Sequence, residues 1–190
     1  MEHEPRAELG YYTDHSGRTI TYERYCTTMP LAAFEYGDRF KALCEGCPRQ
    51  GKNLSCPPHS PRLTDHIGGA GEAVVVCIRL PQEHFSQLPP QDRYHACFRQ
   101  ASRLLVAELL RYRREGRPIA GSGPCLGCER CSLEEGSEIC RNPEERTYSL
   151  ESLGVNVVGL LKNSFDIELE WNTAEKNSEY ISAVGAAFLS

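Results

Sequence analysis

Two stretches of the chain have hydrophobic patterns long enough to predict a regular element without help from their neighbours. Residues 73–80 form a continuous valine-rich run between Gly71 and Pro81, which predicts a buried central strand. Residues 92–114 carry apolar side chains at intervals of three and four, which predicts an amphipathic helix that ends before Gly116. A strand followed by such a helix indicates a crossover connection.

Shorter patterns predict the rest of the fold. Residues 18–25 are rich in β-branched and aromatic side chains, so we expect a strand that ends at Cys26. Residues 155–161 are mostly apolar and predict a second buried strand. The other predicted elements are short helices at 30–40 and 143–153, a half-buried strand at 165–171, a polar turn at 172–177 and a returning hairpin strand at 180–189. Together they predict an α/β or α+β fold, with a single small sheet of roughly four to five strands, flanking helices and two cysteine-rich metal loops.

Length and charge exclude several classes of protein. A chain of 190 residues predicts a single domain, 1–190, whose polar segment 1–17 we expect to be a flexible tail. The formal net charge of −5 argues against a nucleic-acid-binding surface. No apolar run is long enough to span a membrane, and the N-terminus has no hydrophobic signal region. We therefore expect a cytoplasmic protein that binds neither nucleic acid nor membrane.

The cysteines are the strongest chemical signal. The chain has ten, and without a secretory signal they should be reduced or metal-bound rather than disulfide-bonded. Cys125, Cys128 and Cys131 follow one another at two-residue gaps within a loop at 121–146, and Cys140 comes next. Such gaps let a loop turn three sulfurs to one side, which favours a 4Fe–4S cluster. A zinc site more often joins two separate pairs of ligands, but zinc stays an alternative.

A second group lies in the loop region 26–61. Cys44 and Cys47 form a knuckle, and Cys56 follows among prolines. Only three cysteines are close together here, so the fourth ligand could be Cys26, His59 or none from the protein. A structural zinc site made by Cys26 with the three loop cysteines is an alternative.

Two further cysteines belong to predicted core elements. Cys77 lies within the apolar run 73–80, and Cys97 lies on the apolar stripe of the predicted helix. We expect both to be packed thiols rather than ligands.

Two blocks of sequence resemble a known family. The first runs from Cys44 to the prolines after Cys56, and the second from Cys125 through Cys140 to the segment SLESLGV at 149–155. This arrangement resembles the predicted metal-binding proteins of bacteria and archaea, many of them anaerobes, that are described as a domain of unknown function. The resemblance implies cysteine-ligated metal, iron–sulfur before zinc, but supplies no reaction. Neither Cys26 nor Cys97 matches the family pattern.

Three functions fit these observations. The first is electron transfer or cluster-dependent redox chemistry with one or two iron–sulfur clusters and a redox partner protein. The second is an enzyme whose open cluster binds a small-molecule substrate for sulfur transfer or desulfurisation. The third is an interaction protein with structural zinc. The sequence shows neither a phosphate loop nor a dinucleotide-binding motif, and it leaves open whether the protein is an enzyme.

Overall fold

The fold is built on one mixed sheet, shown in a computed structural model that describes residues 7–170 and 177–190. The strand order is β1-β2-β3-β6-β4-β5, and every neighbouring pair is antiparallel except β4 and β5, which are parallel. The strands are β1 (Glu8–Thr13), β2 (Thr19–Pro30), β3 (Glu72–Pro81), β4 (Ile119–Gly121), β5 (Tyr148–Ser149) and β6 (Tyr180–Leu189). The architecture is therefore α+β.

The sheet has six strands in the described residues, so the expectation of four to five is wrong. The short strands β4 and β5 contain three and two residues, too few to produce a recognisable pattern. The segment expected to be a flexible tail, 1–17, contains β1, which pairs with β2 along its whole length.

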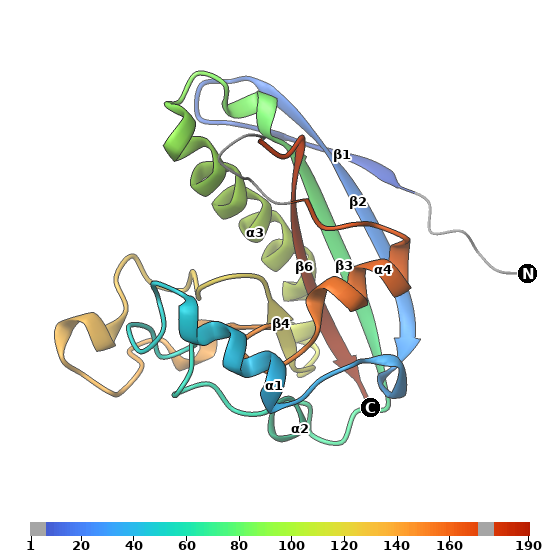
Figure 1. The fold of residues 1–190 in the computed structure, drawn as a ribbon, viewed down its shortest axis with the longest axis vertical. Coiled ribbons are helices and arrows are strands. Elements are labelled where there is room, and N and C mark those ends of the chain that lie inside the picture. The colour runs from blue at the N-terminus through green and yellow to red at the C-terminus, as the bar shows by residue number, and fades with distance from the viewer. Residues whose placement is uncertain (1–6, 171–176) are drawn as a thin grey trace, which may run out of the picture.

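The two long patterns predict their elements correctly. Strand β3 is buried along most of its length, and α3 (Pro90–Arg114) packs against it and β6. Because β3 and β4 are both antiparallel to β6, they are parallel to each other, and α3 forms the crossover between them. Helix α3 covers one face of the sheet (Figure 1), over an apolar cluster that includes Leu105 and Leu109.

The opposite face is covered by α4 and by several loops. Helix α4 (Val157–Phe165) replaces the strand expected at 155–161. The side chain of Asn156 caps it by accepting the N–H of Gly159. Its buried side chains lie at helical spacing and face a second apolar cluster on β2, β3 and β6: Val157, Leu160, Leu161 and Phe165. An apolar segment of this length fits a strand or a helix, and the asparagine cap was the signal that distinguishes them.

Other expectations near the C-terminus are also wrong. The helix expected at 143–153 is a short turn, η5 (Pro143–Glu145), followed by β5 and further turns. Residues 166–170 of the strand expected at 165–171 lie in no regular element, while Trp171 and most of the turn expected at 172–177 lie outside the described residues. Strand β6 is present, but it pairs with β3 and β4 rather than with a hairpin partner.

The remaining elements are short. They are α1 (Asp38–Lys41), α2 (Leu63–His66), η1 (Leu31–Ala33), η2 (Ala42–Gly46), η3 (Gln82–Phe85) and η4 (Ser132–Glu135). The helix expected at 30–40 is thus divided into η1 and α1, with Gly37 between them at a φ of 153°. No helix in residues 7–170 and 177–190 has both the length and the apolar character that a membrane-spanning segment needs.

His66 joins α2 to the sheet and makes stability depend on pH. Its Nε2 lies 2.9 Å from the carbonyl oxygen of Ile119, and its ring packs edge-on against Tyr148. Burial lowers the pKa of His66, and the charges of Arg113 and Arg146 lower it further. The unfolded chain therefore binds the proton more readily. The stability that neutral His66 contributes is present above about pH 6.5 and is lost as pH falls below that value.

We expect His66→Gln to reduce the loss of unfolding free energy between about pH 7.5 and about pH 5.5. A glutamine amide can still donate to the Ile119 carbonyl but does not titrate. One histidine contributes a slope of at most about 1.4 kcal/mol per pH unit. Urea unfolding of both proteins at both pH values measures the difference. An equal pH dependence in the variant and the parent would contradict the prediction.

Candidate metal centre

The first cysteine loop is a series of tight turns. Cys44 lies in η2, the N–H of Cys47 bonds to the carbonyl of Cys44 at 2.9 Å, and the N–H of Cys56 bonds to that of Asn53 at 3.0 Å. The loop is tied to the segment 149–154, because Ser60 Oγ donates to the Ser152 carbonyl at 2.8 Å. These turns hold the three cysteines of the loop outside any strand or long helix.

The second cysteine loop leaves the sheet at β4 and returns at β5. Gly123 has a φ of +69°, and a Cβ there would lie 2.5 Å from the ring of Phe98 in α3. Arg113 of α3 holds the returning end, since its guanidinium donates to the carbonyl of Arg146 at 3.1 Å and to Thr147 Oγ1 at 2.8 Å. Contacts with α3 therefore hold both ends of the loop, and its cysteines lie between these ends.

The sulfurs of the second loop accept hydrogen bonds. Cys125 Sγ accepts from the N–H of Gly127 at 3.4 Å and of Thr147 at 3.5 Å, while Cys128 Sγ accepts from Asn142 Nδ2 at 3.3 Å. Such donors stabilise negative charge on sulfur, the form in which cysteine binds a metal.

A cation lies beside the same loop. A hydrogen bond to Glu135 raises the pKa of the Arg141 guanidinium, and the charges of Cys128 and Cys131 contribute to the same shift. The guanidinium is therefore within electrostatic reach of two of the sulfurs.

The two cysteine loops touch each other, which the sequence did not predict. The N–H of Leu54 donates to Cys131 Sγ at 3.4 Å, and the N–H of Cys125 donates to Ser55 Oγ at 3.2 Å. Ser55 is buried and is held by Asn53, whose Oδ1 accepts from the Ser55 N–H at 2.9 Å and from its hydroxyl at 2.8 Å. Both loops lie on the same side of the sheet, next to each other (Figure 1). Leu54 and Ser55, just before Cys56, thus lie between the two groups of cysteines and connect them through hydrogen bonds.

Residues 28–188 match the model of a family described as predicted metal-binding protein (DUF2284). The chain belongs to the DUF2284 family. The match confirms the family resemblance seen in the two cysteine blocks. No curated protein and no solved structure matches the chain.

The DUF2284 match contains both cysteine loops but not Cys26, which precedes its first residue. Cys26 lies in β2 opposite Val76, and its side chain packs against the apolar cluster under α3. The segment 149–154, to which the first loop is tied, contributes Leu150 and Leu153 to the cluster on the other face. His59 follows Cys56 in the loop and is exposed. His59 contacts Cys56 through its backbone, whose N–H donates to the Cys56 carbonyl at 2.9 Å. No described contact joins the His59 ring or the Cys26 sulfur to the sulfurs of the three loop cysteines.

Burial and mutual charge act on the first group of cysteines. Burial raises the pKa of the Cys44 thiol, and the charges of Glu151 and Cys47 raise it further. Burial also raises the pKa of the Cys56 thiol, with contributions from Cys47 and Cys44. The three cysteines are therefore close enough to repel one another as thiolates, and a bound cation would relieve that repulsion.

Glu151, which was not predicted to have a role, lies beside this group. Cys44 Sγ is 3.9 Å from the Glu151 carbonyl oxygen. The residue as a whole is half-buried, but its carboxylate oxygen Oε2 is enclosed and has no hydrogen-bond partner among the described residues. Burial raises the pKa of the Glu151 carboxyl. The signal available in the sequence was a single acidic residue within the otherwise apolar and small segment 149–155.

The ten cysteines are all free, and they differ in how far they are buried. Cys77 and Cys97 are fully buried in the two apolar clusters. The seven loop cysteines keep some exposure: Cys44, Cys47, Cys56, Cys125, Cys128, Cys131 and Cys140. Cys26 in β2 is partly exposed as well.

The cysteine sulfurs are suitable ligands for a thiophilic metal, although they are not arranged around a common point. Within residues 7–170 and 177–190, no three side chains of His, Cys, Asp or Glu are arranged as a ready-made metal site. The cysteines stand on irregular loops whose ends are fixed, so metal binding would complete the folding of the loops. Cysteine-rich loops of this kind suit iron–sulfur clusters or zinc.

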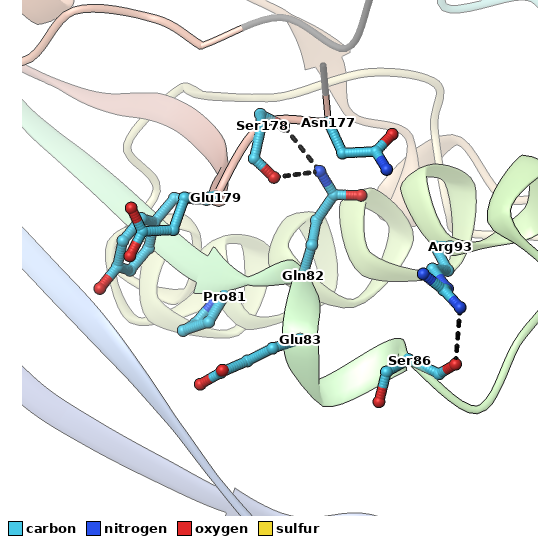
Figure 2. Close-up of a pocket in the computed structure, with 9 residues that line it drawn as sticks. Pro81, Gln82, Glu83, Ser86, Arg93, Asn177, Ser178 and Glu179 are labelled. Carbon is cyan, nitrogen blue, oxygen red and sulfur yellow. Dashed lines mark hydrogen bonds between the residues drawn. The ribbon is translucent and has the colours of Figure 1, made fainter. Parts of the chain in front are cut away.

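A pocket elsewhere on the molecule has different chemistry. Its lining includes Gln82, which donates to Ser178, and Arg93, which donates to the Ser86 carbonyl (Figure 2). It lies where β3 ends and β6 begins, whereas β4 pairs with the far end of β6. No cysteine or histidine lines it, so the candidate centre of this DUF2284 protein is at the cysteine loops.

Proposed function

We propose that this protein binds iron–sulfur clusters, one in each cysteine loop, and acts in electron transfer or other cluster-dependent redox chemistry. The observation that carries the proposal is the hydrogen bonding of the second loop. Cys125, Cys128 and Cys131 each accept at least one N–H hydrogen bond. Hydrogen bonds to sulfur are one of the means by which proteins set the potential of a cluster.

The contact between the loops supports a role in electron transfer. When bound, an iron–sulfur cluster supplies one-electron chemistry. Leu54 and Ser55 precede Cys56 and make hydrogen bonds to Cys131 and Cys125, so the protein places two groups of candidate ligands on either side of one buried turn. Two redox centres at these positions would be neighbours, as electron carriers with two clusters require.

A redox partner would approach the outer side of these loops. Leu43 and Ile139 precede Cys44 and Cys140, and their side chains are 77 % and 79 % exposed. We propose that a partner protein contacts these apolar side chains.

Two other functions are alternatives to this proposal. The first loop contains only three cysteines, which favours an open cluster that takes a small-molecule substrate for sulfur transfer or desulfurisation. The same cysteines could also hold structural zinc in an interaction protein, since zinc accepts three or four thiolates.

The metal content tests the proposed function. We expect protein purified without oxygen to be brown, with iron and acid-labile sulfide in about equal amounts, as in a 4Fe–4S cluster. Elemental analysis, a sulfide assay and the visible spectrum measure this. A colourless protein with stoichiometric zinc would contradict the iron proposals and support the structural one.

A further inference from the structure

A buried carboxylate oxygen near the first cysteine loop has no hydrogen-bond partner in the described part of the molecule. It is Glu151 Oε2, although the carboxyl group as a whole interacts with the Ser149 side chain and with its own backbone N–H. No ion pair joins Glu151 to an arginine or lysine in the described residues. Buried polar groups in native proteins are almost always paired, so an unpaired one calls for a missing partner.

The position of Glu151 indicates what the partner is. Its charge acts on the Cys44 thiol, and its backbone carbonyl oxygen lies 3.9 Å from Cys44 Sγ. Its charge also acts on Tyr94 of α3. An enclosed carboxyl next to Cys44 is suited to a cation that it would share with the three cysteines.

The first cysteine group lacks a fourth protein ligand. Cys26 packs under α3 and lies outside the DUF2284 match, and His59 is exposed. We infer that Glu151 supplies the fourth protein donor to the metal centre held by Cys44, Cys47 and Cys56. This inference rests on the proposed function, because it completes the same centre.

A carboxylate donor gives this centre its own chemistry. Carboxylate oxygen is a harder ligand than thiolate and binds a thiophilic metal less strongly. An added thiol should therefore exchange with Glu151 while the three cysteines stay bound. The exchange is a ligand substitution: the metal–oxygen bond breaks, a metal–sulfur bond forms, the thiol proton goes to solvent or to the released carboxylate, and no electron is transferred. The second centre, with four cysteines, should not respond.

Three variants of the full chain test this inference. Glu151→Gln keeps the size of the side chain and removes the anionic donor. Glu151→Cys, with a shorter side chain, offers a thiolate from the same position. Cys26→Ser removes the competing candidate. Iron or zinc per chain, and the electron paramagnetic resonance spectrum of the reduced protein with and without added dithiothreitol, are measured for each variant and for the parent.

We expect Glu151→Gln to bind metal at the first centre at least about tenfold more weakly while keeping the second centre. Glu151→Cys should keep the metal and lose the response to added thiol that the parent shows. Cys26→Ser should match the parent. Parental metal content and thiol response in Glu151→Gln, or loss of the first centre in Cys26→Ser, would overturn the inference. If Glu151→Gln fails to fold, Glu151→Cys decides: a thiol response unchanged from the parent would overturn it.

The same measurements separate this inference from the proposed function. If the parent holds zinc instead of iron, the iron proposal fails, and the Glu151 inference is then decided by the zinc affinity of Glu151→Gln in competition with a chelator. Unchanged zinc affinity would overturn it, and a loss confined to one of two sites would support it. A parent protein that takes up neither metal would overturn both.

Discussion

Cys128→Ser is expected to empty the second cysteine loop of metal, whereas Cys77→Ala and Cys97→Ala are expected to keep the metal content of the parent. Cys128 is the middle cysteine of the three, and its sulfur accepts a hydrogen bond from Asn142. Removing it takes one ligand from the centre, and the loop has no core of its own to hold its shape. Because metal binding and loop folding are coupled, the remaining cysteines should bind metal only weakly.

The two buried cysteines are matched controls, since each change also removes one thiol. Cys77 and Cys97 have no exposed surface, and Cys97 Sγ donates to the Leu80 carbonyl at 3.5 Å. Each alanine variant should lose about 1 kcal/mol of unfolding free energy through lost packing, without losing metal. Metal analysis and urea unfolding give both quantities. Equal metal loss in all three variants would show that the division between core and ligand cysteines is mistaken.

Gly185→Ala is expected to lower the free energy of unfolding by about 3 kcal/mol. Gly185 lies in β6, and a Cβ at this position would be 2.4 Å from the carbonyl oxygen of Ala120 and 3.0 Å from Leu109 Cδ1. The backbone of β4 cannot move aside without breaking its pairing with β6. Because β4 leads directly into the second cysteine loop, the same change should also weaken metal binding there.

Gly71→Ala provides the matched control for the same chemical change. A Cβ at Gly71 would meet no heavy atom within 4 Å, and its φ is not in the left-handed region. Its unfolding free energy should stay within about 1 kcal/mol of the parent, on the stabilising side if the unfolded chain loses freedom. Chemical denaturation measures the unfolding free energy of both variants. Similar values would contradict the prediction and show that the structure accommodates the Cβ at Gly185 with little loss of stability.

The hydrophobic pattern predicted the centre of the fold well and its periphery poorly. Strand β3 and helix α3 follow directly from a continuous apolar run and from a repeat of three and four. Helix α4 was mistaken for a strand because a mostly apolar run of seven residues fits both periods, and Asn156 decides for the helix through its cap. Strands β4 and β5 form because they pair with neighbouring strands of the sheet. Each has only two or three residues, which is too short to show a hydrophobic period in the sequence.

For the candidate site, too, the sequence predicted the local features but not the contacts between distant segments. The sequence predicted the seven loop cysteines and Cys26 as candidate ligands, and it predicted Cys77 and Cys97 as packed thiols, which are buried. A two-residue gap or a position on an apolar stripe is a local property of the chain. The contact between Leu54 and Cys131 spans 77 residues, and that between Cys44 and Glu151 spans 107. Contacts at such separations depend on strand order, on the crossover through α3 and on which side chains the core excludes. The sequence alone thus predicted which residues are candidate metal ligands. Only the tertiary structure decided which of them meet, because the packing of the sheet brings the two loops together and places Glu151 next to Cys44.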